Sequence, residues 1–392
     1  MNGRERLLRT LHGERADRVP IAPFLYYNAV YEMFDYVPDM DTFFDPPDFD
    51  PIEKFVEYCD HFGFDVLHSL GTVWDFWNAR TTQADGTILR AWDDWDVTVS
   101  DERKGDDKRR TVTITTPGGQ LRLVEVYKRT SKYLIVSAPE EYLIKTSTDF
   151  ELLRKYMPPA DAMDCRLIRR AKVATGDKGL VATCTNGAFN QAAVFRSLEE
   201  LMTDPAIDEG FYREMMEFFV EWVIRRDLKC IENGADVVEV AANLASSTVG
   251  PRFFESQVMG YENRVINALH AVGIPIIYHN CGPAAKIMHL YNEMDIDCLG
   301  YLVPPPFGDV DLDAALQVLK PSMALRGNID QVEFMVTATS EQVSERVVQV
   351  VEKAKTRGNL ILSTTDFFFD GTPYENIHAF TAAGMEHGRY GA

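Results

Sequence analysis

The sequence is short of positive charge. Its 392 residues include 40 Lys and Arg against 60 Asp and Glu, which gives a formal net charge of -20 and a pI near 4.8. Binding to nucleic acid requires clustered Lys and Arg that displace counterions from phosphates, so we expect no nucleic-acid partner. The acidic residues are spread along the chain, which is typical of a solvated protein surface.

Long apolar runs are also missing. No stretch approaches the roughly 18 uninterrupted apolar residues that a membrane span needs. The first residues, MNGRERLLRTLHGERADRVP, are charged and lack the apolar centre of a signal peptide. We therefore predict a cytoplasmic protein without a membrane segment.

Cysteine and nucleotide-binding motifs are sparse as well. The six cysteines lie far apart without the spacing of a disulfide framework, as expected for reduced thiols of a cytosolic protein. No G-x-G-x-x-G or G-x-x-x-x-G-K-[ST] pattern follows a candidate strand, so a nucleotide cofactor has no support.

Alternating helices and strands dominate the chain after residue 149. Strands are expected at 179–183, 236–241, 274–279, 298–302, 323–326 and 360–363, and long helices at 210–233, 255–272 and 340–357. The segment 18–24 is a plausible first strand, preceded by a helix at 2–11. This order specifies a parallel sheet, and the number of units favours an α/β fold of one (β/α)8 TIM barrel.

A different texture separates the first strand from these units. Residues 80–145 alternate Thr, Val, Ile and Tyr and are broken by Asp-Gly, Lys-Gly-Asp-Asp and Pro-Gly-Gly, the pattern of antiparallel β-hairpins. The segment is short for an independent core. We predict one domain, 1–392, in which 80–145 is a β-rich insertion in the N-terminal third.

The triplet His279-Asn280-Cys281 ends one of the predicted barrel strands. Residues i and i+2 of a strand point the same way, so the imidazole and the thiol can converge on one zinc ion. Active sites of barrels lie at the carboxyl ends of the strands. A single His-x-Cys is weak evidence, and a purely structural pair stays open.

Two carboxylates can complete such a site. Asp366 lies just past the last strand, although helix caps and surface carboxylates are common at such positions. Glu239 interrupts the apolar strand 236–241, where its burial requires a cation, a proton or hydrogen-bond donors.

Several motifs resemble those of the uroporphyrinogen decarboxylase superfamily, and within it the corrinoid-dependent methyltransferases. The likeness extends over nearly the whole chain. The matching segments are Arg4-Glu5-Arg6-Leu7-Leu8, Arg18-Val19-Pro20, Thr115-Thr116-Pro117-Gly118-Gly119, His279-Asn280-Cys281-Gly282, Gly327-Asn328-Ile329-Asp330 and Gly371-Thr372-Pro373-Tyr374-Glu375-Asn376-Ile377.

The resemblance implies a zinc site formed by His279, Cys281 and a late cysteine, at whose position this chain has Asp366. A carboxylate in place of a thiolate leaves more positive charge on the metal, which suits an oxygen substrate. This is similar to the branch that demethylates methoxylated aromatics, where the metal activates the ether oxygen and a cobalt(I) corrinoid on a partner protein attacks the methyl group. That branch is described with a glutamate-rich zinc site and a histidine; Glu239, Glu255 and His279 follow its order, though Glu255 also fits an ordinary helix position.

On this basis we expect an enzyme, the O-demethylase component of a corrinoid-dependent methyltransferase system. The expected metal ligands are His279, Cys281, Asp366 and Glu239, and the two carboxylates are also the expected catalytic residues. Candidate substrate-binding residues for an aryl ring are Tyr26, Tyr27, Trp74, Trp77, Phe367 and Asn186, although aromatic side chains at such positions more often serve ordinary packing.

Two other activities stay open. One is a methylcobalamin:thiol methyltransferase of the coenzyme M type. The other is a porphyrinogen decarboxylase, which binds many substrate carboxylates through cations, whereas the region 19–51 here has no Lys or Arg. No D-x-H-x-x-G cobalamin motif is present, so the corrinoid is expected on a separate protein; the sequence leaves a homodimer open.

Overall fold

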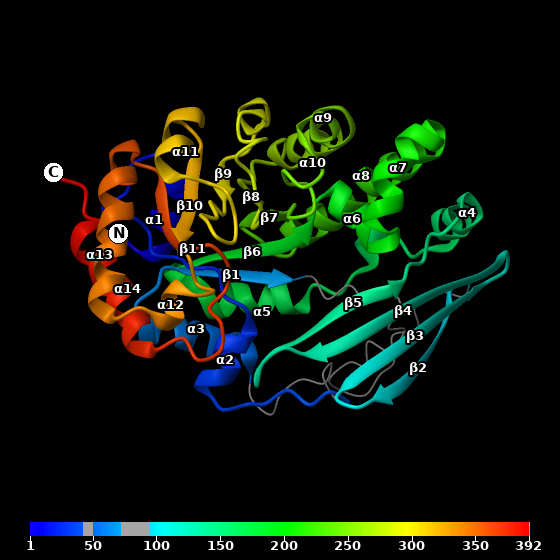
Figure 1. Cartoon of the computed structure of the whole chain (residues 1–392), viewed down its shortest axis with the longest axis horizontal. Helices are drawn as coiled ribbons and strands as arrows, with labels where there is room; N and C mark the ends of the chain where they lie inside the picture. The colour runs from blue at the N-terminus through cyan, green and yellow to red at the C-terminus, as the bar shows by residue number, and fades with distance from the viewer. Residues whose placement is uncertain (42–49, 72–93, 392) are drawn as a thin grey trace.

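The computed structural model describes residues 1–41, 50–71 and 94–391 and contains two sheets (Figure 1). The larger sheet is parallel and has the strand order β1-β6-β7-β8-β9-β10-β11. Its strands are β1 (Val66–Gly71), β6 (Gly179–Asn186), β7 (Val237–Ala241), β8 (Ile276–His279), β9 (Cys298–Gly300), β10 (Ala324–Ile329) and β11 (Leu360–Thr364). The predicted α/β class is confirmed.

An extended segment joins the two edges of this sheet. The amide of Ala22 donates to the carbonyl of Leu362 in β11 at 3.0 Å, and the carbonyl of Ile21 accepts from the amide of Asp65, next to β1, at 2.8 Å. The predicted first strand is therefore a short extended bridge between β11 and β1. The curled parallel sheet, continued by this segment, is TIM-barrel-like.

Helices surround the curled sheet in Figure 1. They are α1 (Gly3–Leu11), α2 (Tyr27–Met33), α3 (Pro51–Phe62), α4 (Ser147–Tyr156), α5 (Arg166–Thr175), α6 (Ala188–Phe195), α7 (Leu198–Ile207), α8 (Glu209–Glu232), α9 (Pro251–Phe253), α10 (Met259–His270), α11 (Leu312–Val318), α12 (Phe334–Thr337), α13 (Ser340–Ala354) and α14 (Tyr374–His387). Local sequence explains several ends: α13 begins at a capping box of Thr339 and Gln342, and α3 ends at Gly63, whose φ is +74°.

The strands of the parallel sheet are buried on both faces, as their apolar sequences require. The amino-terminal half of the barrel interior is filled by small and aliphatic side chains, among them Leu67, Ala182 and Ile277, and α1 adds Leu7 and Leu11 to the same cluster. Because side chains fill this end of the barrel, a functional site is expected at the carboxyl ends of the strands.

The second sheet is antiparallel and has the order β2-β3-β4-β5. Its strands are β2 (Asp96–Lys104), β3 (Asp107–Thr116), β4 (Gly119–Arg129) and β5 (Ile135–Glu141). Figure 1 shows it beside the barrel, below α4 and to the right of α2. The sheet falls within the predicted segment 80–145, of which residues 80–93 lie outside the described residues; one domain with this segment as an insertion stays a prediction.

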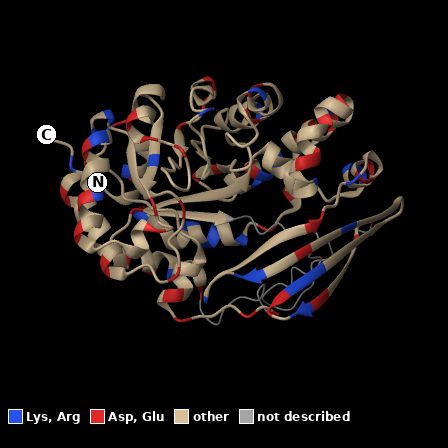
Figure 2. Ribbon diagram, in the orientation of Figure 1, with Lys and Arg blue, Asp and Glu red and all other residues tan. Residues whose placement is uncertain are grey.

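Acidic side chains are distributed over the helices around the barrel, with basic ones interspersed (Figure 2). This fits the solvated surface expected from the composition. In the described part of the chain, no helix is long and apolar enough to cross a membrane.

Candidate metal centre

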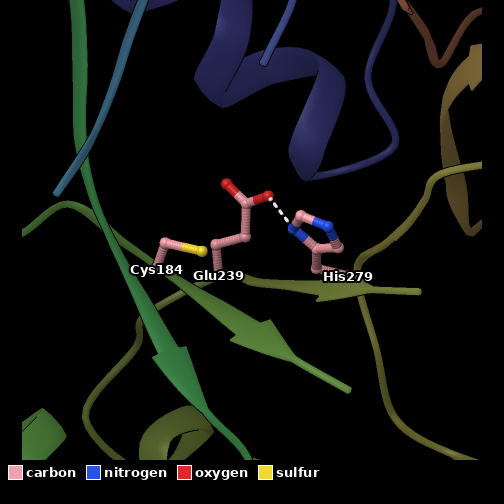
Figure 3. Close-up of side chains that lie close together, drawn as sticks. All are labelled: Cys184, Glu239 and His279. Carbon is pink, nitrogen blue, oxygen red and sulfur yellow. Dashed lines mark hydrogen bonds and ion pairs between the residues drawn. The ribbon is translucent and has the colours of Figure 1, made fainter. Parts of the chain in front are cut away.

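Strand register brings the functional side chains to neighbouring levels of the barrel. Cys184 of β6 lies opposite Glu239 of β7, and Ala241 of β7 lies opposite His279 of β8. Because side chains alternate along a strand, Cys184, Glu239 and His279 all point inward, near the carboxyl ends of their strands. Figure 3 shows these three side chains close together.

Glu239 holds the imidazole of His279 from behind. Its Oε1 lies 2.8 Å from Nδ1 of His279 (Figure 3) and accepts a hydrogen bond from the hydroxyl of Tyr301 at 3.0 Å. Its Oε2 accepts from the hydroxyl of Ser69 at 2.9 Å and from Nη1 of Arg326 at 3.2 Å. Both carboxylate oxygens thus have two partners, although Glu239 is fully buried.

The charge of Glu239 is balanced inside the protein. Burial alone would raise the pKa of this carboxyl, but the positive charge of Arg326 and the hydrogen bond with His279 lower it to about 2. Arg326 is itself fully buried, its Nε donates to the carbonyl of Ala22 at 3.2 Å, and its guanidinium lies 4.7 Å from the ring centre of Tyr301. Glu239, whose burial in an apolar strand requires a partner, is therefore an ionised member of a buried hydrogen-bonded network.

Two groups of potential ligands share His279. One comprises Cys184, Glu239 and His279, and the other His279, Cys281 and Asp366; within each group the ligand atoms lie within 4.8 Å of one another. The structure thus brings the predicted residues His279, Cys281, Asp366 and Glu239 to one place. It adds Cys184, which the sequence analysis did not single out.

A cavity of about 410 Å³ separates these donors into two sets. Cys184, His279, Cys281 and Asp366 line it, whereas Glu239 is not among its lining residues. Burial lowers the pKa of His279, but its hydrogen bonds with Cys184, Cys281 and Glu239 outweigh burial and raise it well above the ordinary value. Four donors therefore face the cavity, and Glu239 lies behind the histidine.

This donor set fits zinc. Imidazole nitrogen, thiolate sulfur and carboxylate oxygen are its usual ligands, arranged as a tetrahedron with three protein ligands in catalytic sites. Since Nδ1 of His279 is occupied by Glu239, Nε2 is the ring nitrogen left for a metal.

The candidate substrate-binding residues are partly brought together. Tyr26, Phe367 and Asn186 line the same cavity, and the rings of Tyr26 and Phe367 meet edge to face with centres 4.7 Å apart. Tyr27 lines an adjoining cavity of about 540 Å³, which shares Tyr26, Phe367 and Cys184 with the first. Trp74 and Trp77 lie outside the described residues.

Part of the cavity wall is polar. It contains Asn186, Gln191, Asn243 and Arg226. Arg226 donates to Oε1 of Gln191 at 2.8 Å and is paired with the buried Asp227 at 2.9 Å, so its charge is largely neutralised. This part of the wall can therefore form hydrogen bonds with a ligand but carries little net charge.

Several participants were missed in the sequence. Cys184, Ser69, Tyr301 and Arg326 are each one residue of a strand or strand end, without a motif of their own. Only Cys184 carried a usable signal: in strand 179–186, the alternation through Leu180 and Ala182 places it on the inward face. Glu255 is exposed on the π-helical turn Phe254–Val258 and belongs to neither ligand group of the described residues.

Fold and site together define a TIM-barrel-like protein with a thiol, imidazole and carboxylate cluster at the carboxyl ends of its strands. The chain belongs to the uroporphyrinogen decarboxylase (URO-D) family, whose sequence profile matches residues 138–387. The family expected from the motifs is thereby confirmed.

Relatives of two activities match the chain. The methylated-thiol–coenzyme M methyltransferase of Methanosarcina mazei is 27% identical over 154 residues, which cover 39% of this chain and 38% of the relative. A uroporphyrinogen decarboxylase of Prochlorococcus marinus is 26% identical over 174 residues, 44% of this chain and 46% of the relative. A methylcobamide:CoM methyltransferase of Methanosarcina mazei is 20% identical over 145 residues, 37% of this chain and 41% of the relative. The chain thus spans less than half the length of these relatives.

A solved structure confirms the fold over the full chain. A methyltransferase from Methanosarcina mazei superposes with a TM-score of 0.69 at 14% identity, covering 98% of this chain and 99% of the other. At this identity the likeness shows the fold alone.

Proposed function

We propose that the protein is a zinc-dependent methyltransferase that moves a methyl group from a methoxylated aromatic compound to the cobalt(I) of a corrinoid on a separate protein. The observation that carries the proposal is the convergence of His279, Cys281 and Asp366 on a cavity that also holds the ring pair Tyr26 and Phe367. Potential ligands and an aromatic surface line the same space.

A zinc ion bound by His279, Cys281 and Asp366 would polarise the ether oxygen of the substrate. Glu239 fixes the imidazole of His279 through Nδ1, and Arg326 keeps that carboxylate ionised. Tyr26 and Phe367 hold the aryl ring by edge and face contacts. Asn186 donates to polar substituents of the ring.

The transfer balances without a further reagent. The bond between the methyl carbon and the ether oxygen breaks, and its electron pair leaves with the phenolate, which then takes a proton from water. The electron pair of cobalt(I) forms the new bond to the methyl carbon, so cobalt becomes methylcobalt(III). The protein itself neither gains nor loses electrons.

The test combines the protein with a reduced corrinoid protein and offers methoxybenzenes, methanol, or methylcobalamin with a thiol. We expect demethylation of an aryl methyl ether with formation of methylcobalt, monitored by the change in corrinoid absorption. Transfer with the thiol alone would reject the proposal in favour of the second candidate.

That second candidate is transfer from methylcobalamin to a thiol. It is supported by the similarity to two methyltransferases named for coenzyme M. Cys184 supports it as well, because two thiolates would make the site softer and more suitable for sulfur.

Decarboxylation of a porphyrinogen fits the cavity less well, although decarboxylases are among the relatives. Among the described residues that line the cavity, Arg226 is the only Lys or Arg, and Asp227 is paired with it. A polycarboxylate would need several unpaired cations. Cytoplasmic location and the separate corrinoid protein are part of the proposal.

A further inference from the structure

A second cavity, of about 540 Å³, lies next to the one that contains the candidate metal ligands. The side chains of Phe24, Tyr26 and Phe367 line both cavities. A molecule whose ether oxygen lies among the candidate ligands can therefore extend its other atoms past these rings into the second cavity. The proposed function has not yet assigned a role to this space.

Parts of the chain that are distant in sequence form the wall of the second cavity. Residues 25–28 and Tyr31 come from α2 and the segment before it, and Phe367 comes from the loop after β11. A further part of the wall is 133–137, which belongs to β5 and the turn before it. The antiparallel sheet therefore contributes side chains to a cavity next to the candidate metal centre.

Hydrogen bonds fasten this part of the antiparallel sheet to the barrel. The carboxylate of Asp370, in the loop after β11, accepts from the amide of Tyr133 at 2.8 Å and from the hydroxyl of Ser131. The same carboxylate accepts from Nδ2 of Asn28 in α2 at 3.0 Å. The hydroxyl of Tyr133 donates to Asp35, just past α2, at 2.9 Å. The three parts of the wall are thus held together by the protein itself.

The lining of the second cavity is aromatic and uncharged. Six of its described lining residues are Phe or Tyr, and none of the described ones is Asp, Glu, Lys, Arg or His. In the neighbouring cavity, Arg226 is already paired with Asp227. A carboxylate placed in the second cavity would lose its water without gaining a cation, whereas a neutral ring would bury apolar area against other rings.

Resting on the proposed function for the methyl ether, we infer that the second cavity binds the uncharged remainder of the aryl substrate. Its wall segment 133–137, contributed by the antiparallel sheet, selects neutral aryl ethers over carboxylated ones. Asp370 is a positioning residue, because it holds this segment against α2 and the loop after β11.

The experiment compares two ligands that share the ring and the methyl ether and differ in charge. The zinc-loaded protein is titrated at neutral pH with para-methoxyphenol and with para-methoxybenzoate, without a corrinoid protein, and calorimetry measures both affinities. We expect the benzoate to bind at least about 10-fold more weakly, because its carboxylate would be buried without a cation.

A lysine placed in the wall should change this preference. Val136 is an exposed residue of β5 that lines the cavity. We expect Val136→Lys to raise the affinity for the benzoate by about 3- to 5-fold, the effect of a partly exposed ion pair. Val99 is an exposed valine of β2 that is not among the described lining residues. Val99→Lys is therefore the matched control and should leave both affinities unchanged.

A bulky side chain at the same wall tests the location of the ring. Ser137 is an exposed residue of β5 that lines the cavity, and we expect Ser137→Trp to lower the affinity for para-methoxyphenol by about 10-fold, because the indole takes up space there. Ala138 is exposed at the next position of β5 and is not among the described lining residues. Ala138→Trp should keep the wild-type affinity.

Equal affinity of the wild type for the two ligands overturns the inference, as does an affinity for para-methoxyphenol that Ser137→Trp leaves unchanged. A protein that binds the phenol with the expected preference but transfers no methyl group to cobalt(I) keeps the inference and loses the proposed function. A protein that demethylates both ligands with equal kcat/KM keeps the proposed function and loses the inference. The two failures are therefore distinguishable.

Discussion

Glu239 and His279 lie on adjacent parallel strands, and Oε1 of the carboxylate is 2.8 Å from Nδ1 of the imidazole. A metal-binding histidine is commonly held in this way, because a carboxylate behind the ring fixes its tautomer and orientation. Arg326 in turn stabilises the carboxylate at 3.2 Å. The charge inside β7 is thus explained by its neighbours on β8 and β10.

Replacing the carboxylate should weaken the metal site without abolishing it. We expect Glu239→Gln to lower zinc affinity by about 10- to 100-fold, because an amide holds the ring less firmly, while zinc content at saturation stays at one per chain. Competition with a chelator measures this. Tyr301→Phe removes one hydrogen bond to the same oxygen and should cost less; equal affinity in Glu239→Gln and wild type would contradict the role of the pair.

The effects of replacing Arg326 and Glu239, which form a buried ion pair, on the free energy of unfolding should not be additive. Arg326→Met leaves a buried carboxylate without its cation, and we expect the free energy of unfolding to fall by about 3–5 kcal/mol. The double variant Arg326→Met/Glu239→Gln removes both charges and should be more stable than the sum of the single losses predicts. Denaturant titrations of the four proteins give the coupling, and simple additivity would count against it.

Glu262 should make stability depend on pH. Burial, opposed by the amide of Phe189 that donates to it at 3.0 Å, raises its pKa from 4.5 to about 7. The native state therefore holds this proton more tightly than the unfolded chain. The resulting contribution to stability is complete below about pH 4.5 and is lost as pH rises through about 7.

Glu262→Gln keeps the carbonyl acceptor and cannot ionise. Above pH 7 we expect this variant to be more stable than the wild type by on the order of 3 kcal/mol, and the difference to shrink toward zero in acid. Urea unfolding at several pH values measures it. A difference that does not change with pH would show that Glu262 does not titrate in this range.

The closed end of the barrel should matter for stability and not for the metal. Leu7 of α1 is fully buried among side chains of the barrel interior. Leu7→Ala leaves a cavity there and should lower the free energy of unfolding by about 2–5 kcal/mol, with zinc stoichiometry unchanged. Leu8→Ala on the same helix, at a half-buried position, serves as the control and should cost less.

The ring of Phe367 should contribute to the binding of the aryl ring of the substrate. We expect Phe367→Ala to raise KM for a methoxybenzene by about 10-fold, since the edge-to-face contact and apolar area are lost, and to leave kcat unchanged. Initial rates give both values. Phe369→Ala, which changes an adjacent ring outside the cavity lining, is the matched control; an equal rise of KM in both variants would argue against an aryl slot.

Much of the fold could be read from the sequence because it depends on local patterns. The strand ending at His279 and the helix starting at Ser340 follow from apolar runs and from the cap residue Thr339. The first strand was placed correctly in the chain, but it is a bridge of a few residues, since its prolines cannot donate to a ladder. β1 (Val66–Gly71) was not predicted, because its short run includes His68 and Ser69.

The candidate site divides in the same way. The sequence by itself determined the inward pair His279 and Cys281, because two residues on one strand end share a face whatever the rest of the chain does. Only the tertiary structure decided which side chains join them. Cys184, Glu239 and Arg326 come from three different strands, and the strand register alone sets their distances from the imidazole. Long-range register depends on the packing of the whole barrel, which no local pattern encodes.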